Sequence, residues 1–126
     1  MGTPAQPGGT KEGRLIAESV AHNREVSRIA SRLLDLDISP RFRQLLAAGL
    51  VLCTAQAHRL GALDDPAALV APALEYNRLL AKLTGLLLDA FPSPTAAGHL
   101  ALAALALNHQ FFILAGVAGI RSQKGS

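Results

Sequence analysis

Residue types that could support catalysis or metal binding are few in this sequence and widely spaced. The four histidines are dispersed, and none is paired at the helical spacing of metal ligands. Cys53 and His58 are five residues apart, a separation that orients them poorly for a nucleophile and its base. No glycine-rich phosphate loop follows a strand pattern. The sequence therefore predicts a protein that is not an enzyme, with no catalytic residue, no metal site and no cofactor.

Basic residues offer a different chemistry, because they recur on one side of a helix predicted over residues 11–34. At about 100° per residue, the four arginines of this helix fall within a sector of about 80°. Glu18 and Glu25 share that sector, so a solvated face with internal salt bridges is an alternative to an anion-binding face. The basic residues of the strip are Lys11, Arg14, Arg24, Arg28 and Arg32.

Two further arginines, Arg41 and Arg43, follow Ser39 and Pro40, which are typical of a helix start. The positive end of a helix dipole is unfavourable for a cation unless an anion is near. A phosphate group would supply that anion, and neighbouring acidic residues such as Asp35 and Asp37 are the alternative. Together with the strip, these arginines are the candidate contacts for the phosphates of an anionic partner.

Composition defines the elements that would position these residues. The 126-residue chain is 50% hydrophobic with few aromatic residues, and its apolar side chains are mainly Leu and Ala, which favour helices. The sequence predicts an all-α fold, with an extended Pro/Gly arm over residues 1–10 and a single helical domain over 11–126. No internal repeat of useful length is evident. The four helices are expected near residues 11–34, 40–60, 66–91 and 95–120, with Pro72 causing a later start or a kink in the third.

The last helix is the least charged part of the chain, from Gly98 to Ile120. Asn108, His109 and Gln110 interrupt it, and we expect one or two of them to form hydrogen bonds between helices. Its small residues allow close helix packing, which predicts contacts between subunits. A membrane span is the alternative, although the polar triplet would then lie near the middle of the bilayer. The predicted packing residues are Ala97, Ala101, Ala104, Gly116 and Gly119.

Three segments together resemble the major coat proteins of rod-shaped and filamentous archaeal viruses with linear double-stranded DNA genomes. They are the Pro/Gly arm over 1–10, the arginine-bearing helix, and the hairpin of residues 86–98 around Pro92 and Pro94. The resemblance concerns the layout of the whole chain and includes no signature motif.

This resemblance implies a virion protein whose paired subunits, identical or sister chains, wrap the DNA backbone with the arm and the basic helix. The later helices would pack between subunits in a helical filament, and residues 98–120 could contact a lipid envelope. Two alternatives come from other classes of protein. The segment from Pro72 to Phe91 also resembles the helical hairpin of some terminase small subunits, which suggests a bacteriophage packaging adaptor, and the apolar last helix suggests a membrane or pilus-type subunit.

Overall fold

The computed structural model describes residues 10–90 and 92–124, and this part of the chain forms four α-helices and no strand. The helices are α1 (Lys11–Leu34), α2 (Pro40–Ala62), α3 (Ala71–Asp89) and α4 (Pro94–Lys124). The predicted all-α fold is therefore confirmed. Residues 1–9 of the predicted arm lie outside the described residues.

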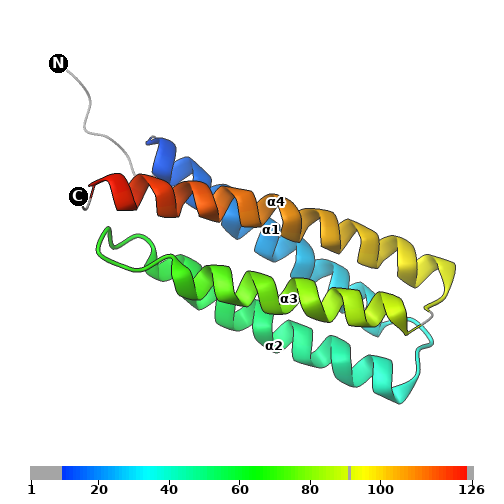
Figure 1. The fold of residues 1–126 in the computed structure, drawn as a ribbon. Coiled ribbons are helices and arrows are strands. Elements are labelled where there is room, and N and C mark those ends of the chain that lie inside the picture. The colour runs from blue at the N-terminus through cyan, green and yellow to red at the C-terminus, as the bar shows by residue number, and fades with distance from the viewer. Residues whose placement is uncertain (1–9, 91, 125–126) are drawn as a thin grey trace.

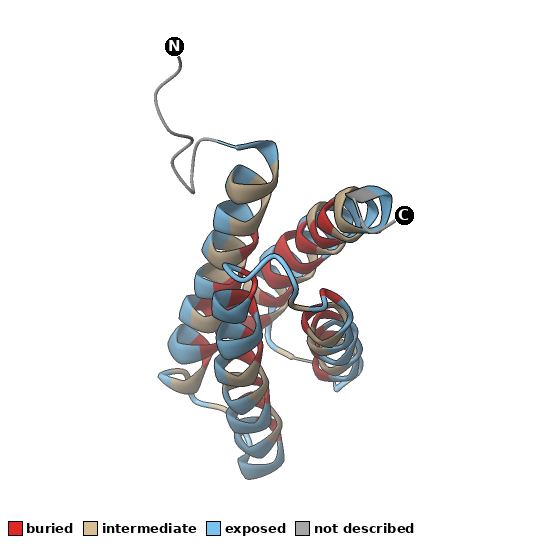
Figure 2. Ribbon diagram, turned by 90° about the vertical axis from the view of Figure 1, so that its left-hand side faces the viewer, coloured by how far each residue is buried: buried red, intermediate tan, exposed pale blue. Residues whose placement is uncertain are grey.

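Successive helices run antiparallel and pack as a four-helix bundle in which each helix contacts two neighbours (Figure 1). The pairs in contact are α1 with α2, α2 with α3, α3 with α4, and α4 with α1, so the last helix closes the ring on the first. The buried side of each helix faces the middle of the bundle and the exposed side faces outward (Figure 2). Each helix thus has one face in the core and one face that is exposed.

Helix starts follow the capping residues of the sequence. Thr10 accepts a hydrogen bond from the Gly13 amide at 2.8 Å, and Ser39 accepts one from the Phe42 amide at 3.2 Å. Such side-chain oxygens satisfy amides that have no partner in the first turn. The third helix begins at Ala71 with Pro72 in its first turn, where a proline costs little. Of the two outcomes predicted for Pro72, the later start is the correct one.

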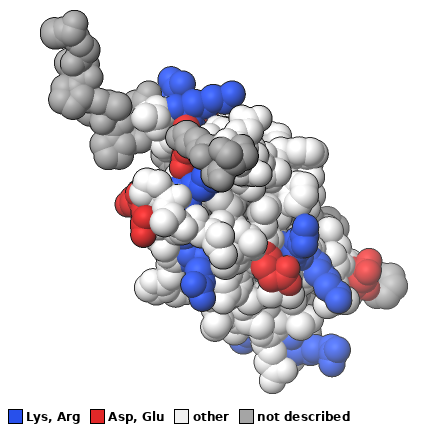
Figure 3. All heavy atoms as spheres, turned by 60° about the vertical axis from the view of Figure 1, so that its left-hand side comes forward, with Lys and Arg blue, Asp and Glu red and all other residues white. Residues whose placement is uncertain are grey.

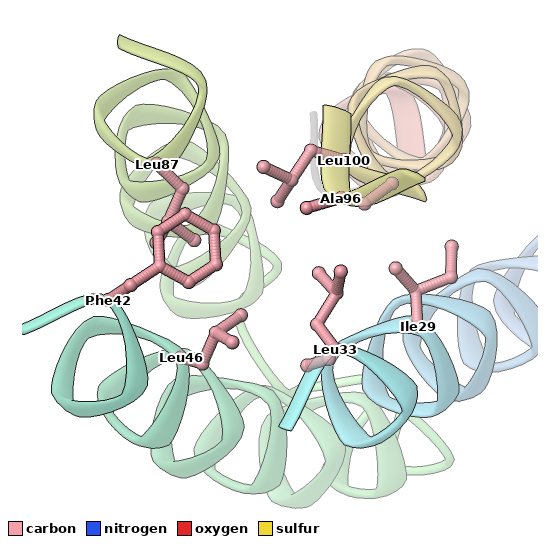
Figure 4. Packing of buried hydrophobic residues seen from close by; sticks show 9 residues of the cluster. Ile29, Leu33, Phe42, Leu46, Leu87, Ala96 and Leu100 are labelled. Carbon is pink, nitrogen blue, oxygen red and sulfur yellow. The ribbon is translucent and has the colours of Figure 1, made fainter. Parts of the chain in front are cut away.

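The core consists mainly of leucine, alanine and valine side chains from all four helices, and it also includes Ile29, Phe42 and Cys53. At one end, Leu33 of α1, Phe42 and Leu46 of α2, Leu87 of α3 and Leu100 of α4 point toward one another (Figure 4). A second cluster around Leu60, Leu114 and Val117 fills the other end.

The two helical hairpins are copies of one pattern, displaced by 54 residues, so the expectation that the sequence holds no useful repeat is wrong. Gln56 and Gln110, which have this separation, occupy equivalent places and bond to each other. The caps repeat as well, because Ser93 accepts from the Ala96 amide as Ser39 does from Phe42. The repeat escapes notice because most matching positions hold different residues. Its identical pairs include Asn23 and Asn77, Arg24 and Arg78, Leu33 and Leu87, Asp35 and Asp89, Ser39 and Ser93, and Pro40 and Pro94.

Candidate nucleic-acid interface and buried amide layer

The predicted basic residues all lie on the surface. Five of them follow the outward side of α1 and two stand at the start of α2, close to the end of α1. The strip from Lys11 to Arg32 covers about 32 Å at 1.5 Å per residue. On the face shown in Figure 3, basic side chains are separated by uncharged surface and have acidic side chains near some of them. The surface is therefore a line of single cations and not a dense patch.

Two of these arginines have partners within the chain. Arg28 Nη1 lies 3.1 Å from Glu25 Oε2, and both side chains are about half exposed. An exposed pair of this kind contributes at most about 1 kcal/mol, so a phosphate could replace the carboxylate. Arg43 donates to the carbonyl oxygen of Leu34 at 2.9 Å, which holds its guanidinium beside the end of α1. The predicted alternative of an internal salt bridge thus applies to Arg28.

The predicted packing residues of α4 divide into two groups. Ala101, Gly116 and Gly119 are exposed, whereas Ala97 and Ala104 are half-buried. The same outward face also exposes three large apolar side chains, Leu102, Leu105 and Phe112, by 55%, 59% and 65%. The bundle therefore leaves an apolar face of α4 open.

Four buried carboxamides, one from each helix, meet in the middle of the bundle. Gln110 accepts hydrogen bonds from Gln56 Nε2 at 2.8 Å and from Asn77 Nδ2 at 3.0 Å, and donates to the carbonyl of Ser19 at 2.8 Å. Asn23 Nδ2 donates to Gln56 Oε1 at 3.0 Å. We call Asn23, Gln56, Asn77 and Gln110 the amide layer.

The layer has the approximate two-fold symmetry of the repeat. Asn23 donates to the carbonyl of Cys53, and Asn77 makes the equivalent bond to Leu107, at 2.8 and 2.9 Å. Gln56 likewise donates to the carbonyl of Ala73, as Gln110 does to Ser19. Buried amides need such partners, because a donor or acceptor that loses water without replacement is costly. The layer satisfies amide groups on every helix at one level.

Sequence reasoning found only part of this layer. The prediction that one or two residues of the triplet bond between helices is confirmed for Gln110, whereas Asn108 and His109 are exposed. His109 contacts the ring of His22, with 5.8 Å between centroids. Asn23, Gln56 and Asn77 were missed because polar residues on an amphipathic helix suggest solvent exposure. Alignment of the two halves of the chain would have revealed them as matching pairs.

Arg121 closes one end of the bundle. Its guanidinium lies 2.8 Å from Glu12 Oε1 and donates to the carbonyls of Leu63 and Ala68 at 2.5 and 2.6 Å. The pair is largely buried, so it links the end of α4 to the start of α1 and to the α2–α3 connection.

By length and composition α2 and α4 could each cross a membrane, but core helices of a water-soluble bundle meet the same criterion.

Cys53 is buried, and burial raises the pKa of its thiol to about 11. Desolvation disfavours the thiolate, which is the reactive form. At pH 8 we expect native Cys53 to react with Ellman's reagent roughly 100-fold more slowly than Cys53 in urea-unfolded protein, from the loss of thiolate alone. The rate of absorbance change measures this directly. Equal rates in the two states would contradict the buried position.

Among residues 10–90 and 92–124, no group of three His, Cys, Asp or Glu side chains could hold a metal ion. A hollow of about 630 Å³ lies between the start of α1 and the end of α2, with Arg24 and Arg121 on its wall.

Comparison with known protein families, curated proteins and solved structures gives no significant match.

Proposed function

We propose that this protein is a structural DNA-binding subunit that coats double-stranded DNA through α1 and the start of α2. The observation that supports the proposal is the line of exposed cations along α1, from Lys11 to Arg32, continued by Arg41 and Arg43. At 24 residues, α1 is about 36 Å long, close to one turn of the DNA duplex.

The mechanism is contact with phosphates and not with bases. Each cation that meets a phosphate releases a condensed counterion, which gives affinity that falls steeply with salt. Contacts of this kind position a protein on DNA but do not specify sequence. With Arg28 shared by Glu25 and a net charge of only +3, one subunit binds weakly. Repetition of subunits along one duplex supplies the effective concentration that makes the coat stable.

The setting we propose is the virion of a filamentous or rod-shaped virus with a linear genome, as the layout resemblance implies. In that setting the uncharged outer face of α4 packs against neighbouring subunits, or contacts an envelope where one is present. Pro94–Ile120 contains no charged residue, which supports a division between a DNA-binding face on α1 and a subunit-packing face on α4.

The proposal is tested by mixing the purified chain with a fluorescent 30-base-pair duplex at 50 and 300 mM NaCl. We expect binding at low salt, a loss of binding of at least tenfold at high salt, and little difference between duplex sequences. Negative-stain electron microscopy with plasmid-length linear DNA should show nuclease-resistant filaments. Absence of salt-sensitive binding would overturn the proposal, and rings without DNA would favour the packaging-adaptor alternative.

A further inference from the structure

The outward face of α4 contains a line of residues at alternating four- and three-residue steps. This spacing is that of a coiled-coil seam, which places all of its members on one side of a helix. Large apolar residues lie in the middle of the line and glycines toward its ends. The residues, which we call the α4 seam, are Gly98, Leu102, Leu105, Phe112, Gly116 and Gly119, with His109 at the centre, and all are exposed.

The repeat shows that the fold itself does not require this seam. Positions 54 residues earlier lie on the outward face of α2 in an equivalent hairpin. There Leu102, Leu105 and Phe112 are matched by Ala48, Val51 and His58, which are smaller or more polar. Two copies of one scaffold thus expose different surfaces. The excess of large apolar groups on α4 points to a partner, since exposed apolar patches commonly mark interfaces.

The order of residue sizes along the seam matches a second copy running in the opposite direction. If two α4 helices cross with His109 at a two-fold axis, Leu105 of each faces Phe112 of the other. Leu102 then faces Gly116, so a large side chain meets a glycine on each side of the axis, and Gly98 faces Gly119 at the two ends. An isologous interface needs this kind of self-complementarity. A parallel pair would instead place each large side chain against its own copy, Leu102 against Leu102 and Phe112 against Phe112.

Charge and area also favour a second copy. Pro94–Ile120 has no charged residue, so two such faces meet without repulsion, while Asn108 and His109 at mid-length are unfavourable against lipid chains. A 31-residue helix is about 46 Å long and about 10 Å wide. Two faces of that size bury on the order of 1,000 Å², which reaches the lower limit for a specific interface.

We propose that the protein forms an antiparallel homodimer through the α4 seam, centred on His109. In the proposed function, the outer face of α4 packs against a neighbouring subunit, and the dimer identifies that neighbour as a second copy. The dimer rests on the proposed function only for its role as a building block of the coat. The DNA-binding face of α1 stays on the surface in each copy, apart from its edge beside α4.

The first test compares two matched substitutions by sedimentation velocity in DNA-free buffer. Wild type should sediment as a dimer at micromolar concentration, and Leu105→Glu should raise the dissociation constant at least 100-fold. Val51→Glu is the control, because Val51 is the equivalent of Leu105 in the repeat and is 69% exposed. A monomeric wild type, or equal loss of dimer in both variants, would overturn the proposal. If the wild-type protein is a monomer that still binds DNA in a salt-sensitive manner, the dimer proposal fails and the proposed DNA binding stands.

The second test determines the direction of the two helices by disulfide cross-linking. A Cβ added at Gly98 or Gly119 meets no atom within 4 Å, so cysteine is tolerated at both. The double variant G98C/G119C should form covalent dimers under mild oxidation, while G98C alone should not, since the two copies of residue 98 lie about 32 Å apart. Cross-linking of G98C alone would show a parallel pair. Flotation of undimerised wild type with lipid vesicles would assign the seam to a membrane; either result overturns the proposal.

Discussion

Replacing Gln110 by alanine is expected to lower the free energy of unfolding by about 3–5 kcal/mol. Gln110 is fully buried and joins three helices through bonds to Ser19, Gln56 and Asn77. Its loss removes three hydrogen bonds worth about 1 kcal/mol each and leaves a cavity in the bundle. Urea denaturation followed by circular dichroism measures the change.

Two further substitutions separate the causes of that loss. Gln110→Met keeps most of the volume but none of the hydrogen bonds, so we expect a smaller loss of about 2–3 kcal/mol. Asn108→Ala, two residues away on the exposed side of α4, should change the free energy by less than about 0.5 kcal/mol. If Gln110→Ala had no larger effect than Asn108→Ala, the amide layer would not be a source of stability.

Neutralising Arg24 and Arg28 together should weaken binding to double-stranded DNA by roughly 10–100-fold near 0.1 M salt. Each lost phosphate contact lowers the slope of log affinity against log salt by about 0.9, so the double variant R24Q/R28Q should lower it by about 1.8. Fluorescence anisotropy over a series of salt concentrations gives both the affinity and the slope.

The repeat supplies a control that changes the net charge equally. Arg78 and Lys82 are the equivalents of Arg24 and Arg28 on α3, and both are exposed. The variant R78Q/K82Q should bind DNA almost as well as wild type, because α3 does not contact α1 in the bundle. Equal weakening by the two double variants would mean that overall charge, and not the face of α1, determines binding.

Sequence reasoning predicted the helices well where local chemistry defines them. The Ser-Pro pairs at Ser39 and Ser93 mark helix starts through capping and a fixed backbone angle, and periodic apolar residues predict α1 over its full observed length. The second and third helices were less well described. Val51 and Leu86 are largely exposed although both helices are rich in apolar residues, because apolar composition alone does not specify which face is buried.

Of the candidate sites, local sequence predicts the basic strip of α1 but not the amide layer or the contacts of Arg121. Exposure of the basic strip could be predicted from its position opposite the apolar stripe of α1. The bonds between the amides of the layer join residues 33 or more positions apart, such as Asn23 and Gln56, and local patterns contain no information on such pairing. The ion pair and hydrogen bonds of Arg121 could not be predicted from local sequence, because its partners Glu12, Leu63 and Ala68 come from the opposite end of the chain and from a loop.

The amide layer has a consequence for the uniqueness of the native state. Leucine and alanine pack in several similar ways, so a core made only of them could slide by one helical turn, about 5.4 Å, at little cost. Such a slip would separate Gln56 from Gln110 and leave several buried amides without partners. Buried polar groups can fix the register of helices in this manner, as a single asparagine does in coiled coils. The layer thereby favours one native arrangement of the helices, and so gives every copy of the chain the same outer surface.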